Sequence, residues 1–144
     1  MENYVDVKLK KLGILNGRDC IYIDKVTFDS WDSLTFKGQI NGSLASEIRK
    51  ELWIPYKLTF KRVLAYYACE LDTFLNSEYG GYMTFDYGDF TVVENSEKLK
   101  NLPIREDFDR SIYKHYRVFT YDTVFDIIAV DFEFKSKLKK AKEL

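Results

Sequence analysis

The C-terminal half of the chain contains the strongest structural signal, the segment YKHYRVFTYDTVFDIIAVDFEFK at residues 113–135. Residues 113–121 are rich in aromatic and β-branched side chains and predict a strand, and Asp122-Thr123 predicts a two-residue turn. Residues 124–135 are expected to form the antiparallel partner strand. Because alternate side chains of a strand share a face, one face of this partner should carry Ile128, Val130, Phe132 and Phe134.

The same two-residue period dominates the rest of the chain. Alternating apolar and polar residues predict strands at residues 5–9, 20–28, 34–40 and 90–94. The first three are expected to pair in sequence order as an N-terminal antiparallel meander. An Asn16-Gly17 pair, a strong turn signal, separates the first two.

Residues 56–75 fit two patterns. Leu58 and Phe60 alternate with polar neighbours, as in a strand, whereas the apolar residues from Val63 onward also fit helical spacing. We interpret the segment as two strands with a bend near Val63 and keep a helix as the alternative.

Two short helices are compatible with the capping signals. Ser96 precedes residues 97–102 and offers a hydroxyl that can accept a free helix N–H, and Pro103 ends the segment. Residues 43–53 are ambiguous, with Ser43 or Ser46 as the candidate cap of a short helix over residues 45–52.

These patterns predict a mainly β protein with minor α content. We expect a single-domain antiparallel β-sandwich or barrel of about seven or eight strands with one or two short helices, because 144 residues suffice for one ordinary domain. The domain is expected at residues 1–134. Residues 135–144 carry five lysines and one glutamate and are expected to form a basic, solvated C-terminal tail.

The residues offer little support for catalysis. The chain has one histidine, His115, and two cysteines, Cys20 and Cys69, that are 49 positions apart, so a zinc site is not expected. No phosphate-binding loop or nucleophile elbow is present, and no carboxylate lies within four residues of His115 to orient it. We therefore expect a protein that is not an enzyme, with no cofactor and no metal.

One window has an unusual composition. Residues 63–97 contain no Lys or Arg, seven acidic residues and eight aromatic residues. Carboxylates attract a cationic protein surface and tyrosines supply rigid contact area, although several of these aromatics are also expected in the core. The candidate partner-binding residues are Asp72, Glu78, Tyr79, Tyr82, Asp86, Tyr87 and Asp89.

Other partners are disfavoured by composition. The only cluster of basic residues that is contiguous in the sequence is residues 135–142, and the net charge is −1, so no nucleic-acid partner is expected. No apolar run approaches the roughly 20 residues that span a bilayer, so no membrane partner is expected. The acidic start differs from a signal peptide, and a cytoplasmic location is expected.

Three segments resemble a family of small uncharacterised proteins of Gram-positive bacteria. The segment HYRVFTYDTVFDIIA at residues 115–129 is similar to a signature of that group, and residues 92–97 followed by Leu99, and residues 55–60, resemble further elements. The similarity covers residues 55–134. Some such proteins are encoded beside polymorphic toxins, so the resemblance implies an immunity protein that neutralises a cognate bacterial toxin.

The residues and the resemblance together predict a non-enzymatic protein-binding module. Two alternatives stay open. The first is a small-molecule-binding β barrel with aromatic side chains in a cavity, and the second is a hydrolase that uses a pair of carboxylates. The sequence leaves the oligomeric state open.

Overall fold

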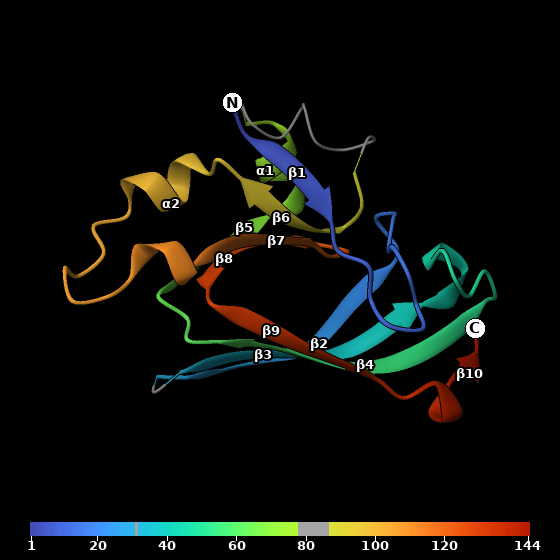
Figure 1. The fold of residues 1–144 in the computed structure, drawn as a ribbon. Helices are drawn as coiled ribbons and strands as arrows, with labels where there is room; N and C mark the ends of the chain where they lie inside the picture. Colours follow the sequence, from blue (N-terminus) through green and yellow to red (C-terminus); the bar gives the residue numbers. More distant parts are fainter. Residues whose placement is uncertain (31, 78–86) are drawn as a thin grey trace.

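In the computed structural model, which describes residues 1–30, 32–77 and 87–144, the chain forms two packed antiparallel sheets (Figure 1). The first sheet has the strand order β1-β6-β7-β8-β5. It comprises β1 Asn3–Asp6, β6 Phe90–Glu94, β7 Lys114–Phe119, β8 Thr123–Ala129 and β5 Ala65–Glu70. The second sheet has the order β10-β4-β3-β2, and β9 also pairs with β4. It comprises β10 Lys142–Glu143, β4 Leu52–Lys61, β3 Ser33–Asn41, β2 Ile21–Asp29 and β9 Asp131–Ser136.

Aromatic side chains from both sheets fill the core. The ring of Phe60, on β4, lies 5.9 Å from Phe90 of β6 and 5.3 Å from Tyr116 of β7, measured between ring centroids. All three residues are buried. This packing of sheet on sheet confirms the predicted mainly β sandwich, with ten strands in the described residues, and the sheets do not close into a barrel.

Two short helices, α1 Leu71–Leu75 and α2 Glu97–Asn101, flank the first sheet (Figure 1). The Ser96 hydroxyl accepts the N–H of Leu99 at 3.0 Å, which confirms the predicted cap of α2. Residues 56–70 form two strands, as preferred, because β4 ends at Lys61 and β5 begins at Ala65. Residues 71–75, predicted to continue the second strand, form α1 instead.

The uncertain segment at residues 45–52 contains no α-helix. A short 3₁₀ helix at Gly42–Leu44 precedes it, and turns lead from there into β4. Two more 3₁₀ helices lie at Arg110–Ile112 and Leu138–Lys140.

Two predicted strand arrangements are wrong. Of the expected N-terminal meander, the second and third strands pair as predicted, as β2 and β3, but β1 pairs with β6 of the first sheet, and the meander is β2-β3-β4. The expected long strand at residues 124–135 divides at Val130 into β8 and β9, which belong to different sheets. The core-facing positions change from odd to even numbers there, from Ile127 and Ala129 to Phe132 and Phe134, so the two halves cannot belong to one continuous strand.

The C-terminal ten residues contact the second sheet. β10 pairs with β4, placing Lys142 opposite Trp53, and the partly buried Leu138 and Ala141 pack against the core. The five lysines of this segment are exposed. In the described part of the chain, no helix has the length and apolar character needed to cross a membrane.

Candidate functional site

Four lysines from four different strands form one row across the outer face of the second sheet. In the strand register, Lys25 of β2 lies opposite Lys37 of β3, Lys37 opposite Lys57 of β4, and Lys57 opposite Lys135 of β9. All four are exposed. Neighbouring strands are about 4.8 Å apart, so the row concentrates four positive charges within about 14 Å. We call these four residues the lysine row.

A β-bulge in β2 creates this alignment. The register between β2 and β3 shifts between Ile23 and Lys25, so that Ile23 lies opposite Gly38 and Lys25 opposite Lys37. Without the extra residue, Asp24 would lie opposite Lys37 and neutralise it, and Lys25 would point toward the core. The bulge therefore replaces an opposite-charge pair with a like-charge pair.

Two residues hold the bulge in place. A side chain at Gly38 would collide with the carbonyl oxygen of Tyr22, so only glycine allows the β2 backbone to approach this closely. The hydroxyl of the buried Tyr56 donates a hydrogen bond of 3.1 Å to the same carbonyl oxygen. Both contacts come from the core-facing side of β3 and β4, so core residues help to determine the position of Lys25.

The charges of the row are only partly compensated. Glu133 of β9 pairs with Lys135 at 3.0 Å and with Lys61 at 3.1 Å. Hydrogen bonds from these two lysines lower the pKa of Glu133 below its ordinary value. Among the described residues, Lys25, Lys37 and Lys57 have no ion pair.

A hollow of about 660 Å³ adjoins the row on the same face. Its floor is formed by neighbouring strands, where Tyr22 lies opposite Gln39 and Gln39 opposite Pro55. The C-terminal segment forms its wall. The hollow, which we call the aromatic hollow, is lined by Tyr22, Asp24, Gln39, Trp53, Pro55, Lys140, Lys142 and Glu143.

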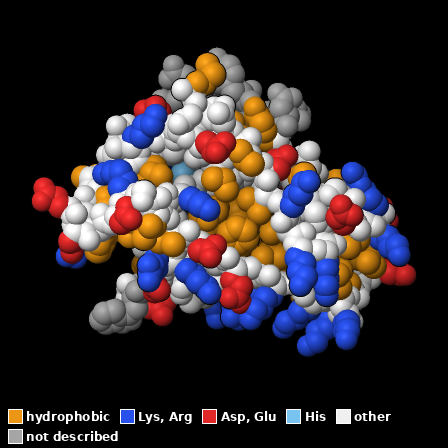
Figure 2. Space-filling view, in the orientation of Figure 1, with side chains coloured by type: hydrophobic (Ala, Val, Ile, Leu, Met, Phe, Trp, Pro, Cys, Tyr) orange, Lys and Arg blue, Asp and Glu red, His pale blue; other side chains and the backbone are white. Residues whose placement is uncertain are grey.

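The rings of the aromatic hollow are arranged by mutual contacts. Tyr22 lies edge-on to Trp53, with centroids 5.0 Å apart, and stacks on Tyr121 at 5.1 Å. Figure 2 shows Lys and Arg side chains gathered along the lower edge of the molecule, where the second sheet lies. The face therefore combines positive charge with half-buried aromatic surface.

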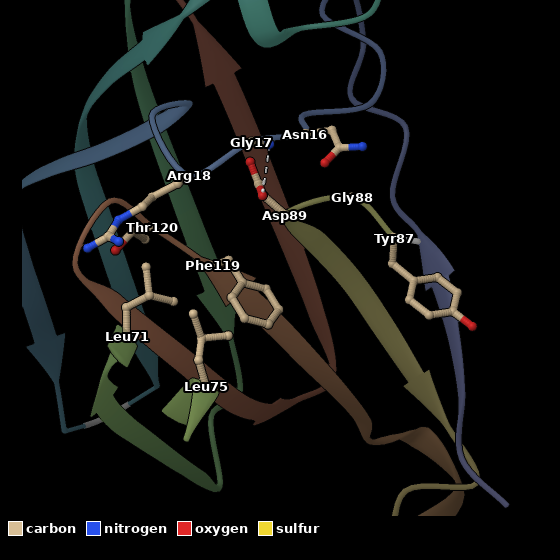
Figure 3. A pocket seen from close by; sticks show the side chains of 10 residues that line it. All are labelled: Asn16, Gly17, Arg18, Leu71, Leu75, Tyr87, Gly88, Asp89, Phe119 and Thr120. Atoms are coloured by element: carbon tan, nitrogen blue, oxygen red, sulfur yellow. Dashed lines mark hydrogen bonds between the residues drawn. The ribbon is translucent and has the colours of Figure 1, made fainter. Parts of the chain in front are cut away.

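The predicted partner-binding residues are only partly described. Glu78, Tyr79, Tyr82 and Asp86 lie outside the described residues. Tyr87 and Asp89 line a different cavity, of about 350 Å³, and Asp72 forms an ion pair of 3.5 Å with Arg18 on its rim. Figure 3 shows this cavity, with Leu71 and Leu75 of α1 on one side and Asp89 near Gly17 on the other.

Asp89 is buried rather than exposed for a partner. Its Oδ1 accepts the N–H of Gly17 at 3.2 Å, and its Oδ2 has no hydrogen-bond partner in the described part of the structure. Burial raises the pKa of Asp89 to about 8, with a smaller contribution from the negative charge of Asp6. A carboxyl that is largely protonated at neutral pH supplies little negative potential to a surface.

The described acids of residues 63–97 do not all form one surface. Glu70 and Asp72 lie at the C-terminal end of β5, whereas Glu94 and Glu97 lie at the C-terminal end of β6. β6 is antiparallel to β7, and β7 runs parallel to β5 because both are antiparallel to β8. The two pairs of acids consequently lie at opposite ends of the first sheet.

His115 belongs to a buried polar network. Its Nε2 lies 2.6 Å from Asp126 Oδ1, and its Nδ1 lies 2.7 Å from the Ser96 hydroxyl. Arg117 donates from Nε to the same Asp126 oxygen at 2.7 Å. Burial raises the pKa of Asp126, but the hydrogen bond from His115 and the charge of Arg117 outweigh it and lower the pKa overall.

The network orients the His115 ring, but the ring has little contact with solvent or with a possible substrate. The side chain of His115 is 1% exposed, and the Ser96 hydroxyl already accepts a backbone N–H as the cap of α2. We interpret the network as structural. No carboxylate lies within four residues of His115 in the sequence, but Asp126 of the neighbouring strand β8 does contact it in the fold.

Sequence reasoning missed the lysine row. The expectation of no nucleic-acid partner relied on contiguous basic clusters, and strand pairing brings together lysines that are 12, 20 and 78 positions apart. A signal was present for Lys37, Lys57 and Lys135, because each occupies a polar position of an alternating segment, whereas Lys25 is turned outward only by the bulge. Comparisons with protein-family models, curated proteins and solved structures found no match, so the resemblance described above stays a prediction.

Proposed function

We propose that the chain is a non-enzymatic binding module that holds a phosphate-bearing polymer on the outer face of its second sheet. The observation that carries this proposal is the register of the lysine row, Lys25-Lys37-Lys57-Lys135. The protein as a whole has a net charge of −1, so the positive charge of this face is a local arrangement and not a consequence of composition.

Electrostatics support a polyanionic ligand. Like charges directly opposite each other destabilise a sheet, and the bulge pairs Lys37 with Lys25 instead of Asp24, while Asp24 stays on the same face in the aromatic hollow. A polyanion restores the missing negative charge and releases its own condensed counterions, which is a favourable entropic contribution.

The side-chain types favour phosphate over an acidic protein. Lysine is depleted at the centre of protein–protein interfaces, whereas it is a common point-charge partner of phosphate. The protein-binding function expected from the sequence stays a prediction. A protein partner of the lysine row would have an acidic surface. The acidic residues at positions 63–97 suggested the opposite, a partner with a basic surface.

The test is binding of two fluorescent polyanions, inorganic polyphosphate and poly-L-glutamate, measured by anisotropy at low salt. Wild type should bind polyphosphate more tightly than polyglutamate. The double variant Lys37→Glu/Lys57→Glu should lose most of the polyphosphate affinity, because two adjacent attractive charges become repulsive.

The matched control is Lys10→Glu/Lys114→Glu, which changes the net charge equally at two exposed lysines outside the row. It should retain nearly all of the affinity. Equal losses in the two double variants, or no polyphosphate binding by the folded wild type, would overturn the proposal. Tighter binding of polyglutamate would replace the phosphate polymer with an acidic protein partner.

A further inference from the structure

We infer that the aromatic hollow holds an unpaired nucleobase, so that the phosphate-bearing ligand of the lysine row is single-stranded nucleic acid. This inference rests on the proposed function and specifies its substrate class. The hollow and the row are continuous, since Gln39 and Lys37 lie two residues apart on β3, and Pro55 and Lys57 lie two residues apart on β4. Alternate residues of a strand share a face, so a chain bound along the row passes the hollow.

The hollow has the size and the apolar surface that a planar heterocycle requires. About 660 Å³ of space lies beside Trp53 and Tyr22, both of which are half-buried. Their edge-on contact and the stacking of Tyr121 on Tyr22 fix the ring orientations before any ligand arrives. Pre-positioned aromatic rings contribute stacking energy without a large ordering cost, and every base has a face that can stack.

The polar groups of the hollow match the edge of a base. Gln39 carries both an amide donor and an amide acceptor, and the Asp24 carboxylate accepts hydrogen bonds from ring N–H or exocyclic amino groups. Asp24 is available at this position because the bulge takes it out of the pairing register. A ligand made only of phosphates would not need Gln39 or Asp24. The Asp24 carboxylate, at the end of the lysine row, would repel such a ligand.

Further lysines extend the positive charge around the hollow. Lys140 and Lys142 line its wall, opposite the side from which the lysine row approaches, and Glu143 is the acidic residue beside them. A base in the hollow can therefore have its flanking phosphates near cations on two sides. A duplex cannot use this site without opening, because its bases are stacked and paired inside the helix.

The experiment uses the intrinsic fluorescence of Trp53. The chain contains two tryptophans, so Trp31→Phe leaves Trp53 as the single reporter. This variant is titrated with three ligands of equal length, about twelve nucleotides each, which lies within the site sizes of single-strand binding folds. The ligands are oligothymidylate, the same backbone with abasic sugars, and a duplex.

Oligothymidylate should bind roughly ten-fold or more tightly than the abasic backbone, and it alone should quench Trp53. Gln39→Ala should reduce the preference for oligothymidylate and leave the abasic affinity unchanged. The matched control is Thr35→Ala, which lies on the other side of Lys37 on the same face of β3 and should change neither value.

The outcomes separate the two proposals. Equal affinity for oligothymidylate and the abasic backbone, without quenching of Trp53, would overturn the base site and leave polyphosphate binding by the lysine row intact. Equal or tighter binding of the duplex would also overturn it. Absence of binding by all three ligands, together with absence of polyphosphate binding, would overturn the proposed function itself.

Discussion

Tyr56 illustrates how one buried side chain determines the position of a surface charge. Its hydroxyl donates to the Tyr22 carbonyl, and Gly38 leaves room for that carbonyl to approach. The sequence predicted Tyr56 in a strand, but it contained no sign of this hydrogen bond, because the acceptor lies 34 positions away. Contacts of this kind depend on register, which pattern alone does not determine.

Replacing Tyr56 with Phe tests this contact. The variant should lower the free energy of unfolding by about 0.5–1.5 kcal/mol, because the partly buried hydrogen bond from the Tyr56 hydroxyl to the Tyr22 carbonyl is lost. Denaturant titration measures the change, with Tyr66→Phe as the control at an exposed tyrosine. Equal effects of the two substitutions would show that the Tyr56 hydroxyl does not support the bulge.

Asp89 provides a second prediction at this scale, for the pH dependence of stability. Its folded pKa of about 8 lies above the ordinary value of a carboxyl, so the folded state retains a proton that the unfolded state releases. The contribution of Asp89 is therefore fully favourable below about pH 4 and is lost as the pH rises to about 8.

The variant Asp89→Asn removes this titration and keeps an oxygen for the Gly17 N–H. It should be more stable than wild type at pH 8, and its unfolding free energy should fall less between pH 5 and pH 8. Parallel pH profiles for the two proteins would contradict a raised pKa at Asp89.

Individual strands were predictable from the sequence where apolar and polar residues alternate clearly. Which strands pair with each other was not predictable. Residues 20–28, 34–40 and 90–94 form β2, β3 and β6 close to the expected bounds, and burial alternates clearly along β3. The pairing of β1 with β6 spans nearly 90 residues and leaves no local signal. The division of residues 124–135 could be seen only in the change of core parity at Val130, which the apolar run at residues 127–130 conceals.

The candidate site was unpredictable for the same reason. Lys37, Lys57 and Lys135 were visible as polar residues of alternating strands, but Lys25 was not, because the bulge at Asp24 decides which residue of β2 faces Lys37. A search for contiguous basic clusters cannot find a row that runs perpendicular to the strands.

At the scale of a strand element, the row should reduce stability. Lys37 faces a lysine on each side, so Lys37→Thr removes two like-charge pairs and should raise the unfolding free energy by about 0.5–1 kcal/mol. The control is Lys61→Thr on the adjacent strand, which removes an attractive contact of 3.1 Å with Glu133 and should not stabilise. A loss of stability in Lys37→Thr would indicate that the lysines do not repel one another.

The core and the outer faces of the two sheets carry different kinds of side chains. The core between the sheets is apolar and aromatic, the outer face of the first sheet carries the buried network of His115, Arg117 and Asp126, and the outer face of the second sheet carries the lysine row. A net charge near zero thus conceals a local row of four positive charges, although Asp24, Asp29, Asp131 and Glu133 are exposed on the strands that carry it. Long-range attraction of a polyanion depends on this local field rather than on the total charge.

The most direct measurement is the salt dependence of polyphosphate affinity. With four lysines in contact with phosphates, and with the coefficient of a single-stranded nucleic acid applied to polyphosphate, the logarithm of the association constant should fall against the logarithm of salt concentration with a slope of about −2.8. Lys37→Gln/Lys57→Gln should reduce the magnitude of that slope by about 1.4. An unchanged slope in this double variant would show that the row does not touch the polymer.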